Sequence, residues 1–365
     1  MINKIAKTVI AVPFVLSAMG TAQALEFGVF SDITFSDSGV EGEDAGFALG
    51  ALDFYGTAQI DENTRVFIEY VFENGSDGLI TDLERLWVAR TISDELTIGV
   101  GRFHSPLGYW NRTYHHGAIL QDTVSRPFFL EFEDGAGAIL PVHVVGLMAT
   151  GDFALSSGYL EYEAYIANGP SIDTSVATAA DREIEINDSG DNNASKSVGF
   201  RTTFTPNVSD MSVSLFVMSN VVSDSGGVVA GGMGQALVSE TISGMDLAYR
   251  MDDFDLIVEY YNLSNKDEAG ALGTQTGTAY YIQLGHQFAD AWKLSVRHEA
   301  ISTKEGGDRY FRELGIKDAS HNVAAIRYDI DDTNALKFEV NQSNPEDGTE
   351  KESTAYMMQW SFLVP

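Results

Sequence analysis

The chain contains no cysteine among its 365 residues. Disulfides and thiolate metal sites are therefore excluded. Basic residues are also scarce, because 22 Lys and Arg stand against 53 Asp and Glu, and the formal net charge is -31 at pH 7. A chain without a basic excess cannot neutralise many phosphates, which argues against a nucleic-acid partner. Divalent cations and cationic solutes fit this balance of charge.

Long apolar runs are missing beyond the N-terminus. The first residues carry Lys4 and Lys7, then a mostly apolar run over residues 8–19, and then Ala22-Gln23-Ala24. This pattern predicts a signal peptide over residues 1–24 and an exported mature chain over residues 25–365. The apolar run is shorter than the roughly 20 residues that a spanning helix needs, and the alternative is a buried N-terminal helix. No later run is longer, so any membrane role must use strands.

Apolar and polar side chains alternate along most of the remaining chain. In RVFIEYVFEN, for example, Val66, Ile68 and Tyr70 share one face. Arg65 and Glu69 share the other face. Alternation of this kind predicts strands with one apolar face, and about 16 strands of roughly ten residues each are expected. Their expected spans are 26–35, 46–60, 65–73, 83–92, 96–103, 142–149, 154–168, 196–205, 211–221, 243–251, 254–264, 277–288, 291–302, 320–331, 335–342 and 353–363.

The connections between these strands alternate in length. The short ones are expected at 61–64, 93–95, 150–152, 206–210, 251–253, 289–291 and 331–334, and they are rich in Asp, Asn and Gly, as tight turns require. The long polar ones include 104–141, 170–195, 222–242 and 303–319. This alternation predicts an all-β transmembrane antiparallel up-and-down β-barrel with short periplasmic turns and long external loops. A large soluble β-sandwich or β-propeller is the alternative, in which the apolar faces would form a core.

The last strand has a strongly apolar face. It carries Tyr356, Met358, Trp360 and Phe362 at every second position. In a barrel this face points at lipid, and the last strand must pair with the first, LEFGVFSDITF, to leave no open edge in hydrocarbon. Aromatic belts are expected at the two membrane interfaces. Their candidates are Trp292, Trp360, Tyr280, Tyr328, Phe338 and Phe362.

Several segments resemble Gram-negative outer-membrane porins, and distantly the phosphate-selective porin O/P type. They are the signal peptide, GRFHSPLGYW at 101–110, EAYIANGP at 163–170, GFRTTFTPN at 199–207 and the aromatic C-terminal strand. The resemblance implies a homotrimer of barrels in contact with outer-membrane lipids and lipopolysaccharide. It also implies that Tyr356, Met358, Trp360 and Phe362 are read by the outer-membrane assembly machinery, although Leu-Val-Pro follows Phe362 here.

The resemblance further implies that one long loop folds inward to narrow the pore. The longest connection, 104–141, is the expected constriction loop. Its candidate residues are Arg112, His115, His116, Asp122, Arg126, Glu131, Glu133 and Asp134. The candidate pore wall consists of Arg65, Glu69, Glu161, Glu163, Arg201, Arg250, Glu259, Arg297, Glu299 and Arg327, and it extends to Lys293, Lys337 and Glu339. Opposed charges at a narrow point would rank solutes by charge and dipole. The alternative for each residue is that it only solvates the lumen.

No motif predicts an enzyme, a cofactor or a metal site. The pair His115-His116 has no HExxH pattern around it, and the lipase elbow G-x-S-x-G is absent. The sequence therefore predicts a passive diffusion channel for small hydrophilic solutes and ions. A weak cation preference is expected, since the strand-borne basic residues are matched by acids and the acidic excess lies mostly in loops. The alternative is a plugged barrel that serves as a structural or binding scaffold for a surface partner.

Overall fold

The structure is a computed structural model. It describes residues 26–75, 78–115, 117–133, 137–186, 193, 195–228, 234–303, 307–346 and 351–365. The predicted signal peptide and the candidate site residues His116 and Asp134 lie outside the described residues. Among the residues that are described, no helix is long and apolar enough to cross a membrane.

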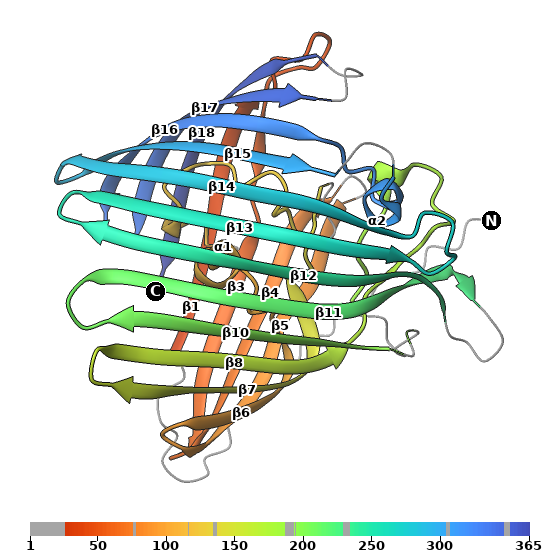
Figure 1. The fold of residues 1–365 in the computed structure, drawn as a ribbon. Coiled ribbons are helices and arrows are strands. Elements are labelled where there is room, and N and C mark those ends of the chain that lie inside the picture. Colours follow the sequence, from red (N-terminus) through yellow and green to blue (C-terminus); the bar gives the residue numbers. More distant parts are fainter. Residues whose placement is uncertain are drawn as a thin grey trace, which may run out of the picture.

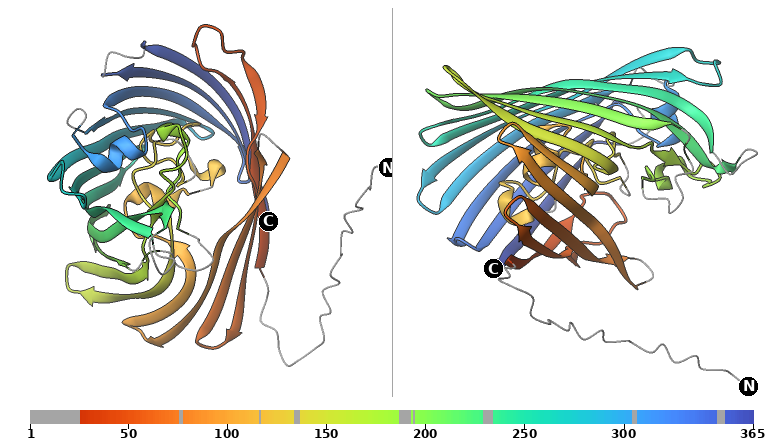
Figure 2. Two further views of the ribbon diagram at one scale, coloured as in Figure 1. Left: turned by 90° about the vertical axis from the view of Figure 1, so that its right-hand side faces the viewer. Right: turned by 90° about the horizontal axis from the view of Figure 1, so that it is seen from below.

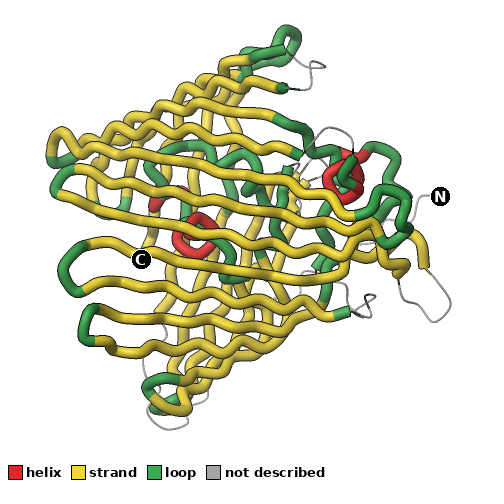
Figure 3. The backbone as a smooth tube through the Cα atoms, in the orientation of Figure 1, coloured by secondary structure: helices red, strands yellow, loops and turns green. Residues whose placement is uncertain are grey.

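Antiparallel strands form the wall of a closed barrel (Figures 1 and 3). They are β1 (Glu26–Asp37), β2 (Gly46–Leu49), β3 (Leu52–Asp61), β4 (Thr64–Gly75), β5 (Gly78–Ser93), β6 (Leu96–His104), β7 (His143–Leu155), β8 (Gly158–Asn168), β9 (Ser171–Ile172), β10 (Lys196–Pro206), β11 (Asp210–Val228), β12 (Gly234–Met251), β13 (Phe254–Asp267), β14 (Thr274–Ala289), β15 (Trp292–Ser302), β16 (Ala319–Asp331), β17 (Asn334–Pro345) and β18 (Ser353–Val364). The described parts of the connections contain the short helices α1 (Tyr109–Thr113) and α2 (Arg309–Glu313) and the 3-10 helices η1 (Ala118–Leu120) and η2 (Ala179–Asp181).

The number of wall strands agrees with the prediction. The sheet contains 18 strands. Of these, β2 and β3 pair one after the other with the same strand, β1, and together make one strand of the wall. β9 has two residues and pairs in parallel with β11, so it is not counted in the wall. The wall therefore consists of 16 strands, which is the predicted number.

The two ends of the chain close the barrel. β18 pairs antiparallel with β1, from Val29 opposite Val364 to Asp37 opposite Tyr356. β1 pairs in turn with β2 and β3. The left view of Figure 2 shows the resulting ring of strands, with the orange and yellow coil between β6 and β7 inside it. The predicted pairing of the last strand with the first is confirmed, and it closes the ring of strands that the structure describes.

The alternating side chains point as predicted. Ile68, Phe200 and Phe338 lie on the outer face and are exposed. Glu69 and Arg201, one position away on the same strands, are buried inside. On the last strand, Tyr356, Met358 and Trp360 are exposed, whereas Phe362 is half-buried. A wall with apolar side chains outside and charged ones inside is the arrangement that a barrel in a membrane needs.

One predicted turn is wrong. The sequence places a tight turn at residues 150–152, but β7 continues to Leu155 and the turn lies at residues 156–157. Gly151 belongs to β7, and a Cβ added there would collide with the carbonyl oxygen of Glu95. The Gly-Asp dipeptide thus marks a close approach of two backbones rather than a reversal of the chain. The other six short turns lie where they are predicted, within a residue or two.

Two long connections also differ from their predicted form. The connection predicted at 222–242 is mostly strand, because β11 extends to Val228 and β12 begins at Gly234. The connection at 170–195 contains β9 and η2, which the sequence does not predict. Polar composition misleads at 222–242, because the polar residues there alternate with apolar ones that are buried, such as Val222, Leu237 and Val238.

One part of the inner wall is apolar, which the simple alternation does not predict. Met218, Ile242, Ile257, Leu263 and Ala279 come from β11 to β14 and are buried. They belong to one hydrophobic cluster with side chains of the connection between β6 and β7. This connection therefore covers the wall of β11 to β14 from within, and the barrel contains a packed core in addition to its polar interior.

Candidate functional site

The connection between β6 and β7, residues 105–142, lies inside the barrel and is called the inner loop below. Trp110, Phe129 and Ile139 of this loop are fully buried. The Trp110 ring packs edge-on against Tyr281 at 5.9 Å, and Phe129 packs against Tyr261 at 6.1 Å. The predicted constriction loop thus occupies the interior, and three sets of polar contacts hold it there.

The first set of contacts is centred on Glu259 of β13. The backbone N–H of Trp110 donates to Glu259 Oε1 at 2.6 Å, and the hydroxyl of Tyr281 donates to the same oxygen at 2.5 Å. Tyr261 donates its hydroxyl to the other oxygen. Gly108 fits beside this group with φ 77° and ψ 159°, a conformation that is open essentially to glycine alone. A Cβ at residue 108 would overlap Tyr261 and Glu259.

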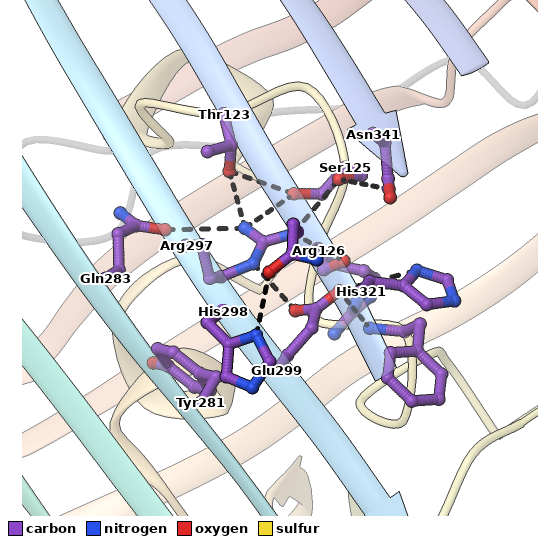
Figure 4. Close-up of polar contacts among 12 residues, drawn as sticks. Thr123, Ser125, Arg126, Tyr281, Gln283, Arg297, His298, Glu299, His321 and Asn341 are labelled. Atoms are coloured by element: carbon purple, nitrogen blue, oxygen red, sulfur yellow. Dashed lines mark hydrogen bonds and ion pairs between the residues drawn. The ribbon is translucent and has the colours of Figure 1, made fainter. Parts of the chain in front are cut away.

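The second set of contacts is centred on Arg297 of β15 (Figure 4). Its guanidinium donates to Thr123 Oγ1 at 2.9 Å, to Ser125 Oγ at 3.0 Å and to the carbonyl of Arg126 at 3.1 Å. Arg297 also pairs with Glu299 at 2.7 Å, and both side chains are fully buried. Glu339 of β17 accepts the backbone N–H groups of residues 124 and 125 at 2.6 and 3.1 Å. Residues 123–126 are therefore held by a basic side chain of the wall, Arg297, and by an acidic one, Glu339.

The third set of contacts holds the turn around η1. Arg327 of β16 donates to the carbonyls of Ile119 and Gln121 at 2.6 and 2.8 Å. Lys337 of β17 donates to the carbonyl of Ala118. Lys293 of β15 bridges Asp122 of the inner loop and Asp255 of the wall at 2.7 and 2.6 Å. The basic side chains of this wall thus bind the carbonyls and the carboxylate of the loop.

The remaining candidate loop residues also have specific partners. Arg112 pairs with Glu163 of β8 at 2.8 Å. Arg126 lies 3.8 Å from the centre of the Phe132 ring, a cation–π contact. Glu133 accepts from His143 Nδ1 at 2.7 Å. Glu131 has its own interaction within the fold.

The phenols of α1 and its C-cap lie among these contacts. Burial raises the pKa of Tyr109 and of Tyr114. Both phenols therefore remain neutral, and neither adds charge to the lumen near neutral pH.

The candidate wall residues fall into two groups. Arg201, Glu259, Arg297 and Glu299 are buried against the inner loop or paired within the wall, Arg201 with Asp246 at 2.7 Å. Glu69 pairs with Arg85 of β5, and Arg327 with Asp329 at 2.8 Å. Arg65, Glu161 and Arg250 are exposed to the lumen or its mouth, and Arg250 lies 3.9 Å from Asp210.

Two water-accessible cavities lie beside the inner loop, toward the short turns. One has a volume of about 500 Å³ and is lined by Arg65, Arg85 and Arg112 together with four acids, Asp94, Asp152, Glu161 and Glu163. The other has a volume of about 700 Å³ and is lined by Arg250, Lys293 and Arg327 together with five acids, Asp122, Asp210, Asp255, Asp329 and Asp332. Each cavity therefore carries a modest acidic excess.

The sequence identifies most of these charges but not their partners. Glu84, Arg85, Arg102 and His143 are not among the predicted site residues, although each is buried or paired in the interior. Arg85 could have been predicted as a residue of the pore wall, because it lies on the polar face of its strand, opposite Glu69. Arg90 on the other face pairs with Asp61 near a short turn, where its side chain reaches water.

No known family profile and no curated protein matches this chain. Solved structures of outer-membrane proteins do match. The anion-selective porin of Comamonas acidovorans covers 93% of this chain and 99% of its own, with 12% identity and a TM-score of 0.62. The outer-membrane channel DcaP of Acinetobacter baumannii covers 93% and 97%, with 9% identity and a TM-score of 0.60. A trimer form of OmpT of Vibrio cholerae covers 93% and 99%, with 10% identity and a TM-score of 0.59. The chain therefore has the porin fold.

Proposed function

We propose that the protein is an outer-membrane porin, a passive diffusion channel for small hydrophilic solutes and ions. The observation that carries this proposal is the charged, water-accessible space beside the inner loop. A barrel of this fold with an inner loop and two cavities lined by acidic and basic side chains supports an aqueous route for solutes. Transport then needs neither a cofactor nor an energy source, and no catalytic role is assigned to any residue.

The inner loop acts as the constriction in this proposal. Its backbone is fixed by Glu259, Arg297 and Glu339, so the width of the passage is set by the fold rather than by a mobile segment. Solutes partition into the lumen and are ranked by size, charge and dipole.

The passage is proposed to prefer cations weakly. A phosphate-selective pore needs free cationic donors along its path. Here Arg201, Arg297 and Arg327 each have an acidic partner at 2.7, 2.7 and 2.8 Å. Acidic side chains outnumber basic ones in the lining of both cavities. Cations are therefore expected to be concentrated there.

Export and assembly complete the proposal. Residues 1–24 are removed as a signal peptide, and residues 25–365 enter the outer membrane, where lipids and lipopolysaccharide surround them. Tyr356, Met358, Trp360 and Phe362 form the signal for the assembly machinery. The trimer form reported for OmpT of Vibrio cholerae supports a homotrimer here.

Planar-bilayer recording tests the channel function. The mature protein is reconstituted with a tenfold KCl gradient across the membrane. Stepwise conductance in groups of three and a reversal potential on the cation side are expected. A reversal potential on the anion side would contradict the cation preference, and folded, heat-modifiable protein without conductance would contradict the channel.

A plugged barrel that acts as a scaffold is the second candidate. The apolar packing of Trp110, Phe129 and Leu140 inside the barrel favours it, since these side chains exclude water from part of the lumen. The same recording separates the two, because a plugged scaffold passes no ions.

A further inference from the structure

Three histidines meet where the inner loop leaves the wall and returns to it. His104 ends β6, His143 begins β7, and the two residues are paired across the sheet. His115 comes from the inner loop, just after α1. One ligand nitrogen from each histidine lies within 4.8 Å of the others. These three residues and the neighbouring Glu84 of β5 are called the histidine cluster.

The distances within the histidine cluster suit ligands around one ion. His143 Nε2 lies 3.0 Å from His115 Nε2 and 2.9 Å from Glu84 Oε2. The ring centroids of His104 and His115 are 3.7 Å apart. Ligands of a tetrahedral zinc ion with bonds of about 2.0–2.1 Å lie about 3.3 Å from one another. The candidate nitrogen of His104 lies within 4.8 Å of those of the other two histidines.

Glu133 of the inner loop gives His143 the orientation of a metal ligand. Its Oε1 lies 2.7 Å from His143 Nδ1, on the far side of the ring from the histidine cluster. A carboxylate that accepts from Nδ1–H makes Nε2 the ring nitrogen that can bind a metal ion. This pairing of carboxylate, histidine and metal is common around zinc.

The charges around the histidine cluster favour a cation. The side chains of Glu84 and Glu133 are 8% and 12% exposed. The guanidinium of Arg102, also 8% exposed, lies 3.5 and 3.7 Å from them. Two buried carboxylates beside one guanidinium leave an excess of negative charge, which favours a bound cation.

We propose that the histidine cluster binds a divalent transition-metal ion, with zinc as the closest fit. Imidazole and carboxylate ligands suit zinc, whereas magnesium and calcium take oxygen ligands. Because His115 belongs to the inner loop and the other ligands to the wall, the ion would tie the inner loop to β5, β6 and β7. The proposal is independent of whether the barrel conducts.

Zinc titration of the folded, EDTA-treated protein tests the site. Isothermal calorimetry and elemental analysis are expected to give one tightly bound zinc ion per chain, and cobalt substitution should give the visible absorption of a tetrahedral centre. Magnesium should not compete. Zinc should also raise the midpoint of thermal unfolding, a readout that does not depend on conduction.

Variants then locate the binding. Glu133→Gln should weaken zinc binding by about ten- to a hundredfold, and His115→Ala by more, while His298→Ala on β15 serves as the control without effect. His115 lies in the loop, so its variant keeps the strands intact, and heat-modifiability checks its folding. Equal zinc uptake by the variant His104→Ala/His115→Ala would overturn the proposal by placing the ion on the acidic loops. No zinc uptake by the unaltered protein would overturn it as well. His143 would then only form hydrogen bonds with the carboxylates of Glu84 and Glu133.

Discussion

Inward-facing charges behave differently on two parts of the barrel wall. On β13, β15 and β17, Glu259, Arg297 and Glu339 are buried and bind the backbone of the inner loop. On β4 and β8, Arg65 and Glu161 are exposed and line a cavity. The residue types are alike in both places, but Arg65 and Glu161 are the second and fourth residues of their strands, nearer the short turns, whereas each of the other three is the sixth. The difference shows that a wall charge at the height of the inner loop holds structure, whereas one nearer the short turns faces solute.

The largest effect is expected from breaking the buried pair on the first part of the wall. Arg297→Met leaves Glu299 buried and without its cation, at a separation that was 2.7 Å. The free energy of unfolding should fall by roughly 3–5 kcal/mol. Urea unfolding of the folded protein in lipid vesicles measures it.

Two further variants make this test specific. Arg297→Met/Glu299→Gln should recover part of the loss, because no buried charge remains uncompensated. The matched control Arg65→Met removes an exposed arginine and should change the free energy by about 0.5 kcal/mol or less. Equal losses in Arg297→Met and Arg65→Met would remove the distinction between the two parts of the wall.

A smaller effect is expected from Gly108→Ala in the inner loop. The φ of 77° and ψ of 159° at residue 108 cost a non-glycine residue about 1–3 kcal/mol. The added Cβ also displaces the loop from Tyr261 and Glu259. The variant should be less stable and should show a wider, noisier conductance in bilayer recordings. An unchanged conductance would mean that this end of the loop does not limit the passage.

The local parts of this architecture can be read from the sequence, whereas the contacts of the inner loop cannot. Alternation has a period of two residues, so the strands and the closure of β18 on β1 follow from short segments. The bond from the Trp110 backbone to Glu259 joins residues 149 positions apart, and that from Val124 to Glu339 joins residues 215 apart. No local pattern encodes such pairs.

One signal in the sequence does point to the inner packing. In the stretch DLIVEYYNL, Ile257, Tyr261 and Leu263 are apolar on the face that carries Glu259. The opposite face is apolar as well, and a strand with two apolar faces is covered on both sides. The sequence could therefore have predicted which wall the inner loop covers, although not with which residues.

A stability loss similar in size to that of Gly108→Ala, together with a change of selectivity, is expected from a wall charge that both binds the inner loop and lines a cavity. Lys293 joins Asp122 of the inner loop to Asp255 of β13 and also lines the larger cavity. Lys293→Met leaves these two carboxylates without their shared cation, and a stability loss of about 1.5–3 kcal/mol is expected. The variant should also become more cation-selective, since the cavity loses a positive charge. A shift of the reversal potential toward anions would contradict this expectation.

The smallest effect is expected from the two exposed charges, and it concerns selectivity alone. Arg65 of β4 and Glu161 of β8 line the same cavity and are exposed. Arg65→Gln should move the reversal potential in a KCl gradient toward the cation side by a few millivolts, and Glu161→Gln should move it toward the anion side by a similar amount. Each change removes one charge from an exposed side chain. Glu161→Gln keeps the side-chain length and Arg65→Gln shortens it, so shifts in opposite directions report the charge rather than the size of the side chain. Both shifts should shrink in concentrated salt, because exposed charges are screened over about 10 Å at 0.1 M and about 3 Å at 1 M. A shift of the reversal potential in the same direction in both variants would contradict this prediction. It would mean that the substitutions rearrange the lumen and that these two charges do not determine ion selectivity directly.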